Sequence, residues 1–190
     1  MNTTCKPQIV CPACGRMAQL VGDQQYYCYY CDWESRNKTA NVAYCNLKTT
    51  VLSPLFPHKF KFSAYGSTEV VCPSMDSLLQ SLKIQDPVLQ KCVCENYSGS
   101  ASALLHEESI PTILYWNGNV ILRDSKDYTD FVTHAYDCLF RESMAFRELV
   151  LPRYKDCYII SSIRSNDKTR TLLTEDELVY QLRRLIAFIK

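Results

Sequence analysis

Four cysteines near the N-terminus have the spacing of a metal site. They form two C-x-x-C pairs, Cys11 with Cys14 and Cys28 with Cys31, and thirteen residues separate the pairs. Two such pairs match the ligands of a tetrahedral four-thiolate zinc site, whereas a redox C-x-x-C usually comes as a single pair. Gly15 suits the tight turn that follows the first pair in such a site. The spacing therefore predicts a zinc ribbon that holds one structural Zn²⁺ ion.

A second candidate site lies on the helix that the sequence predicts for residues 74–83. Asp76, Gln80 and Lys83 recur at offsets of four and seven residues, which places them along one side of that helix. A carboxylate and an ammonium group two turns apart, with an amide between them, suit general acid–base chemistry and the recognition of a ribose. The alternative is a polar face that only contacts water, as on every amphipathic helix.

A third candidate set combines aromatic rings with an arginine. Tyr115 and Trp116 lie beside an Asn117-Gly118 turn, where aromatic rings could stack on a nucleobase. Rings in such positions also serve as core residues or as cross-strand pairs of a hairpin. Arg123 could bind a phosphate through two N–H groups, or form a surface salt bridge instead.

Nucleophilic catalysis has little support in the sequence. The three histidines, His58, His106 and His134, stand in no spacing typical of a metal site or a catalytic triad. A cysteine–histidine dyad would require the fold to bring its two members together.

The composition limits the class of protein. The 190 residues are 47% hydrophobic and 22% charged, which suffices for one core of ordinary size with a small additional module. A net charge of +1 gives no global electrostatic case for nucleic-acid binding. Five glycines, without a G-x-G-x-x-G or Walker-type pattern, argue against a phosphate-binding loop.

The cysteines and the hydropathy predict a cytoplasmic, intracellular protein with no membrane partner. The sequence shows neither a signal peptide nor an apolar run of about 18 residues. The seven cysteines outside the two pairs are then expected to be reduced and mostly buried. Cys5 and Cys45 flank the ribbon and could serve as alternate zinc ligands.

Hydrophobic periodicity predicts the elements that position these side chains. Ser74 is a good N-cap for the helix at 74–83, and a capping box from Thr174 to Glu177 starts a C-terminal helix. The Asn117-Gly118 pair marks a hairpin turn. Further expected elements are strands at Asn41–Cys45, Lys59–Ala64 and Tyr158–Ile163, a helix from Asp86, and a long helix over Tyr128–Arg147.

Together these elements predict an α+β fold that is mostly helical with a few short strands. The expected organisation is a zinc ribbon at residues 1–35, a connector at 36–50 and a main domain at 51–190.

From about Val51 to Lys190 the chain resembles the NADAR family, which is associated with NAD and ADP-ribose chemistry. Leu52–Pro57 is similar to the family's opening Leu-Ser-Asn-Phe-Tyr-Pro, and residues 74–83 are similar to its Ser-Val-Glu helix, which ends in a lysine. In this chain Asp76 replaces the family's glutamate, and Pro54 replaces its asparagine. The later segments that follow the family's order are Ile84–Lys91, Gly99–Ala103, Leu114–Gly118, Arg123–Tyr128, Ala135–Phe140 and Thr171–Leu178.

The resemblance implies an N-glycosidase, a hydrolase that cleaves the bond between ADP-ribose, or a related ribosyl group, and a base such as guanine. Asp76 would stabilise an oxocarbenium-like transition state and activate water, and Lys83 would orient the ribose or assist the leaving group. The residues expected to bind the substrate are Gln80, Tyr115, Trp116, Asn117 and Arg123.

The resemblance also leaves open a weak or inactive NADAR-like module that binds an ADP-ribose-type nucleotide. The zinc ribbon would then recruit a protein or nucleic-acid partner, whereas in the enzyme it would help to place a nucleic-acid substrate. Four thiolates fill the zinc shell, so the ribbon itself is expected to have no catalytic role.

Overall fold

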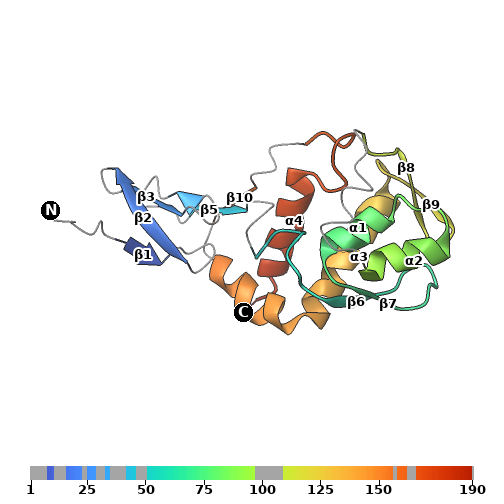
Figure 1. Ribbon diagram of the computed structural model, residues 1–190, viewed down its shortest axis with the longest axis horizontal. Helices are drawn as coiled ribbons and strands as arrows, with labels where there is room; N and C mark the ends of the chain where they lie inside the picture. The colour runs from blue at the N-terminus through green and yellow to red at the C-terminus, as the bar shows by residue number, and fades with distance from the viewer. Residues whose placement is uncertain are drawn as a thin grey trace.

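The computed structural model describes residues 8–10, 16–22, 25–28, 33–34, 42–45, 51–96, 109–155, 158–161 and 166–189. These residues have the predicted α+β architecture, in which helices pack with short strands. Figure 1 shows the helices gathered at one end of the molecule and a small sheet of N-terminal residues at the other.

The N-terminal sheet is an antiparallel meander. Its strands are β1 (Gln8–Val10), β2 (Met17–Gly22), β3 (Gln25–Cys28) and β4 (Trp33–Glu34), and they pair in the order β1-β2-β3-β4. In a meander alternate connections leave the sheet at the same end. The strand ends Val10, Met17, Cys28 and Trp33 therefore lie at one end of this sheet.

A second sheet joins two distant parts of the chain. Strand β5 (Val42–Cys45) pairs in parallel with β10 (Tyr158–Ser161). Both strands were predicted from the sequence, at Asn41–Cys45 and Tyr158–Ile163, and both are confirmed. The segment that we expected to be a connector, residues 36–50, thus contributes a strand that pairs with a distant part of the chain. The boundaries 1–35, 36–50 and 51–190 stay predictions.

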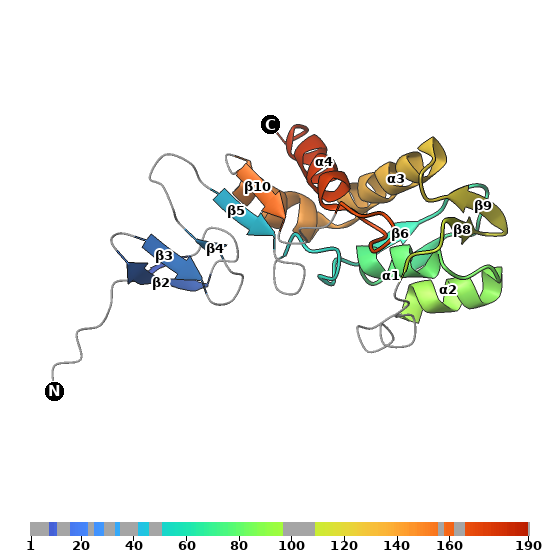
Figure 2. The ribbon, with the colours of Figure 1, turned by 90° about the horizontal axis from the view of Figure 1, so that it is seen from above.

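The central hairpin packs between helices. Strand β6 (Phe60–Phe62) pairs with β7 (Val70–Cys72), and it buries two phenylalanines while Lys61 faces water. Helix α1 (Met75–Ser81) follows with Ser74 as its N-cap, as predicted, and α2 (Pro87–Asn96) comes next. Helices α1 and α2 contact β7, whereas α3 contacts β6 from the other side (Figure 2).

A second hairpin leads into the longest helix. Strands β8 (Ile113–Trp116) and β9 (Asn119–Leu122) meet at Asn117 and Gly118, whose φ angles of 49° and 79° are those of a hairpin turn. Helix α3 (Lys126–Glu142) begins at the N-cap Ser125. The sequence predicted this helix to continue to Arg147. It ends at Glu142 instead, because Ser143 adopts an extended ψ of 96°, and a π-helical turn (Ala145–Val150) and a 3₁₀ turn (Leu151–Tyr154) follow.

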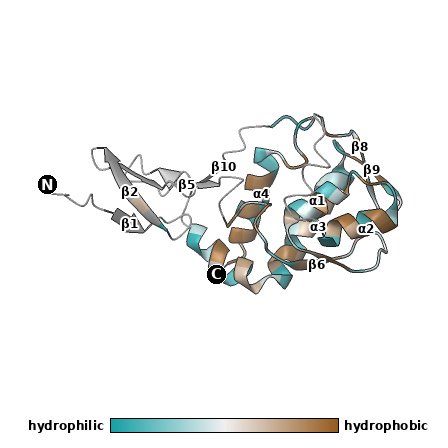
Figure 3. Ribbon diagram, in the orientation of Figure 1, coloured by the Kyte–Doolittle hydropathy of each residue, from teal (hydrophilic) through white to brown (hydrophobic). Residues whose placement is uncertain are grey.

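Helix α4 (Glu175–Ile186) closes the fold. Its capping box has both predicted hydrogen bonds, from the Glu177 amide to Thr174 Oγ1 and from the Thr174 amide to Glu177 Oε2. Figure 3 shows hydrophobic and hydrophilic residues on different faces of α3 and α4. The face of α3 that the sequence predicted to be apolar is buried, namely Tyr128, Phe131, Val132, Ala135 and Leu139.

One buried amide links α1, α2 and the second hairpin. Gln90 on α2 is 3% exposed, and its Nε2 donates to the carbonyl oxygens of Ser81 (3.1 Å), Ile84 (3.1 Å) and Tyr115 (2.6 Å). Its Oε1 accepts from the Asn117 amide at 2.8 Å. Because the two N–H groups and the oxygen of one side chain are shared among four backbone groups, this amide links the hairpin to the helices.

Among the described residues, no helix has both the length and the apolar character that a membrane crossing requires.

We predict that Gln90→Leu destabilises the protein by about 3 kcal/mol, because several buried backbone groups lose their partner. Urea unfolding followed by circular dichroism measures this change. Gln80→Leu is the matched control, since Gln80 is partly exposed and its side chain donates one hydrogen bond, to Asp76. Equal unfolding midpoints for the two variants would contradict the role assigned to Gln90.

Candidate functional site

Two of the three residues predicted along α1 contact each other. Gln80 Nε2 donates to Asp76 Oδ1 at 3.3 Å, and the Asp76 amide donates to the Pro54 carbonyl at 2.9 Å. Lys83 follows the end of α1, and its amide donates to the Gln80 carbonyl. None of the three cavities described below is lined by Asp76, Gln80 or Lys83.

The aromatic candidates have structural contacts. Trp116 is 2% exposed and packs edge-on against Phe62 and Phe131, with ring centroids 5.2 and 5.5 Å away. Its Nε1 lies 3.3 Å from both the Ala64 carbonyl and Ser67 Oγ. Trp116 is therefore one of the core residues that we weighed as the alternative to a stacking platform, and it does not lie beside Asp76 in a pocket.

Arg123 lies in a buried ion pair, not at the surface. It is 3% exposed, and its two terminal nitrogens donate to the two carboxylate oxygens of Glu177 at 2.9 and 2.8 Å. Nη2 also donates to the Thr171 carbonyl at 3.2 Å, and the guanidinium lies 4.2 Å from the centre of the Tyr128 ring. Its Nε has no hydrogen-bond partner among the described residues, but the side chain is buried, so no N–H group of Arg123 is open to a phosphate from the solvent.

The pair keeps Glu177 ionised. Burial alone would raise the pKa of its carboxyl, but the hydrogen bonds from Arg123 and Thr174 and the positive charge of Arg123 lower it below 4.5. Burial likewise raises the pKa of Tyr128, whose hydroxyl donates to the Leu172 carbonyl. An ionised carboxylate and a protonated phenol therefore lie next to each other between α3 and α4.

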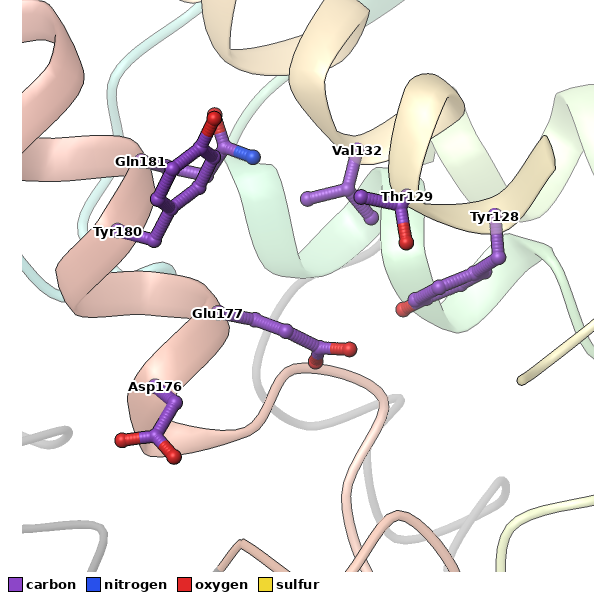
Figure 4. A pocket seen from close by; sticks show the side chains of 7 residues that line it. All are labelled: Tyr128, Thr129, Val132, Asp176, Glu177, Tyr180 and Gln181. Atoms are coloured by element: carbon purple, nitrogen blue, oxygen red, sulfur yellow. The ribbon is translucent and has the colours of Figure 1, made fainter. Parts of the chain in front are cut away.

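A cavity of about 230 Å³ opens between α3 and α4 at this point. Figure 4 shows Glu177 reaching from α4 toward Tyr128 on α3, with Thr129 and Val132 beside it on α3. Its lining consists of Tyr128, Thr129, Val132, Asp176, Glu177, Tyr180 and Gln181. Both charged residues of this lining are acidic. A more open hollow of about 540 Å³ shares Asp176 and Tyr180 with it.

The histidines do not form a catalytic dyad in the described part of the chain. His134 Nε2 lies 3.7 Å from Cys138 Sγ, but it also lies 2.9 Å from the Ser63 carbonyl. A nitrogen that donates to a carbonyl cannot accept the thiol proton, so this contact lacks the geometry of a base and a nucleophile. Burial lowers the pKa of His58, and its ring packs on Phe56 and Phe146 beside a cavity of only about 10 Å³.

The predicted zinc ligands fall largely outside the described residues. Cys11, Cys14 and Cys31 lie in the undescribed ranges, and only the backbone of Cys28, at the end of β3, is described. Within the described residues, no group of three or more His, Cys, Asp or Glu side chains could hold a metal ion. The zinc site therefore stays a prediction, as does the nucleic-acid partner assigned to the same segment.

Comparison with known proteins gives a family for most of the chain. The family model of bacteriophage protein GP30.3 matches residues 48–186. The chain belongs to the bacteriophage GP30.3 family. No curated protein and no solved structure matches it.

This family replaces the one inferred from sequence motifs. The resemblance to the NADAR family is wrong, because the GP30.3 model covers the same residues. With it, the predictions of an N-glycosidase and of an ADP-ribose-binding module are also wrong, and the family match leaves the predicted zinc ribbon without support. The motifs suggested a ligand-binding site, but two of their residues have structural roles. Trp116 fills the core, and Arg123 is paired with Glu177.

The cavity between α3 and α4 was not predicted as a site. Tyr128 and Val132 were identified as core residues, and Glu177 only as the last residue of the Thr174–Glu177 capping box. The sequence contained part of this information, because Arg123 directly follows the apolar run Val120–Leu122, and a charge that becomes buried needs an acidic partner. The sequence does not indicate which of the 20 acidic residues that partner is.

We predict that Glu177→Gln destabilises the protein by about 3 kcal/mol at neutral pH, because it leaves the Arg123 charge buried without a counter-charge. The pKa of Glu177 is lowered in the folded state, so its carboxylate stabilises the fold above about pH 4.5 and less as the pH falls through the folded-state pKa. The difference in unfolding free energy between wild type and Glu177→Gln should therefore shrink toward pH 3.

Urea titrations at pH 7, 5, 4 and 3 measure this difference. Lys168→Ala is the control, since it removes an ion pair with Asp124 that lies at the surface and should leave the unfolding midpoint almost unchanged. A Glu177→Gln variant as stable as Lys168→Ala at pH 7 would show that the pair does not hold the fold together.

Proposed function

We propose that the protein is a binding module whose cavity between α3 and α4 takes a small organic cation. The observation that supports this best is the lining of the cavity, which combines two tyrosine rings, an apolar side chain and two carboxylates without a basic residue. Apolar recesses with a few polar groups are the usual sites of small ligands, and aromatic rings attract cations.

The size and charge of the cavity restrict the ligand. A volume of about 230 Å³ admits a single ring or a short branched chain. Glu177 is neutralised by Arg123, but Asp176 is an exposed carboxylate on the same wall, so the lining of this cavity keeps one negative charge. Arg183 and Arg184 belong to the adjoining hollow, where Arg184 is paired with Asp137. A positively charged ring is therefore favoured over a neutral or anionic ring of the same shape.

We predict that benzamidine binds this cavity more tightly than benzamide, its neutral isostere, and that benzoate shows no binding. Chemical shifts of the Val132 methyl groups report on the site during titration with each compound. Asp176→Asn should weaken benzamidine binding by about tenfold through the loss of one charge-assisted contact. Glu175→Gln is the matched control, because Glu175 lies in the same helical turn but outside the lining.

Filling the cavity provides an independent test. Val132→Phe should abolish the binding of benzamidine while circular dichroism shows that the helices remain. Equal affinities for benzamidine and benzoate, or unchanged binding to Val132→Phe, would contradict the proposal.

We propose in addition that the N-terminal segment binds one structural zinc ion through Cys11, Cys14, Cys28 and Cys31. The spacing of the cysteines supports this, and so does the meander, because the strand ends that flank the two C-x-x-C pairs in the sequence lie at the same end of the sheet. The expected role is to stabilise a sheet too small to be stable by itself.

Metal analysis of the purified protein should find about one zinc ion per chain. Cys11→Ser and Cys28→Ser should each lose it, whereas Cys92→Ser, which changes an exposed thiol of α2, should keep it. A folded protein without metal, or a Cys28→Ser variant with full zinc content, would contradict this assignment.

A further inference from the structure

Two buried thiols lie in contact between β7 and α2. Cys72 is the last residue of β7, and Cys94 lies in the C-terminal half of α2. Their sulfur atoms are 3.4 Å apart, and neither side chain is exposed to water. No motif or site described above uses this pair.

We propose that Cys72 and Cys94 form a reversible disulfide when the protein is exposed to a peroxide. A disulfide requires a sulfur–sulfur distance of about 2.05 Å and neighbouring backbones that already lie close together. Here the two elements are packed against each other, and the Val71 amide lies 3.4 Å from Glu95 Oε1 immediately beside the thiols. The sulfurs must approach by a little more than 1 Å, which small side-chain rotations supply.

The neighbouring cysteines are less suited to pair with either thiol. Cys92 precedes Cys94 by two residues, so it lies on a different side of α2, where it is exposed. Cys138 Sγ contacts His134 and Arg141 on α3. Among the four cysteines whose side chains are described, Cys72 and Cys94 are therefore the pair that lies close enough to form a disulfide.

The oxidation takes place in two steps. The sulfur of one thiol attacks the peroxide, the O–O bond breaks, and a sulfenic acid and one water molecule form. The second sulfur then displaces the hydroxyl of the sulfenic acid, so that an S–S bond forms, the S–O bond breaks and a second water leaves. Hydrogen peroxide is reduced by two electrons, and a thiol reductant restores both cysteines.

Burial determines when the reaction occurs. The hydrogen bond to Cys94 and burial raise the pKa of Cys72, which keeps its thiol protonated and unreactive in the closed structure. Oxidation then requires local opening of α2, and the bond, once formed, prevents that opening. The disulfide closes a loop around α1 and fixes α2, which also carries Gln90, against the β6–β7 hairpin.

Peptide mapping of the full chain tests the pair directly. Reduced protein is treated with hydrogen peroxide, remaining thiols are alkylated, and trypsin digestion is carried out without reductant. Cleavage after Lys61, Lys83, Lys91 and Arg123 gives one peptide with Cys72 alone and one that contains both Cys92 and Cys94. The Cys92→Ser variant leaves Cys94 as the single cysteine of the second peptide, so a cross-link between the two peptides identifies the bond.

We expect a Cys72–Cys94 cross-link in wild type and in Cys92→Ser, and its disappearance after treatment with dithiothreitol. Oxidation should lower the equilibrium constant of unfolding by about two orders of magnitude, and Cys94→Ala should abolish this gain. A cross-link of Cys72 to another cysteine, or oxidised protein in which Cys72 and Cys94 are still alkylated, would overturn the proposal. The peptide map of the wild-type protein by itself shows whether the Cys72–Cys94 cross-link forms, so the test does not depend on whether Cys94→Ala folds.

Discussion

The buried ion pair between Arg123 and Glu177 is the constraint on which the rest of this fold depends. Arg123 follows strand β9 and Glu177 lies in the first turn of α4, 54 residues later in the sequence. The charge of an arginine that is only 3% exposed has to be compensated, and here one carboxylate compensates it through two hydrogen bonds. The pair therefore holds the end of the second hairpin against the first turn of the C-terminal helix.

The same pair creates the cavity that we propose as a binding site. The guanidinium lies over one face of the Tyr128 ring, and the Tyr128 hydroxyl bonds the Leu172 carbonyl just before α4. The ring is thereby fixed on the floor of the cavity, and Glu177 is fixed on its wall. The carboxylate of a capping box normally caps only the start of its helix. The Glu177 carboxylate caps α4, neutralises the buried charge of Arg123 and also lines the cavity between α3 and α4.

Much of the fold could be predicted from the sequence, because local rules govern it. The N-caps Ser74 and Thr174, the Asn117-Gly118 turn and the apolar face of α3 all lie where hydrophobic periodicity and capping preferences place them. The site could not be predicted, because it depends on contacts between residues about 50 positions apart. From the sequence alone, Arg123 fits the role of a phosphate ligand, and only the structure shows that it is paired with Glu177. Likewise, Trp116 fits the role of a stacking platform, and only the structure shows that Phe62 and Phe131 pack against it. The end of α3 was missed for a similar reason, since nothing local marks Ser143 as the residue that leaves the helix.

A crystal structure of the protein soaked with benzamidine is the most direct test of the central claim, that the Arg123–Glu177 pair shapes a cation-binding cavity between α3 and α4. We predict density for the ring between Tyr128, Val132 and Tyr180, with the amidinium facing the Asp176 and Glu177 carboxylates and both Arg123–Glu177 hydrogen bonds intact. Density for benzamidine elsewhere with this cavity vacant, or a Glu177 side chain that turns away from Arg123, would contradict it.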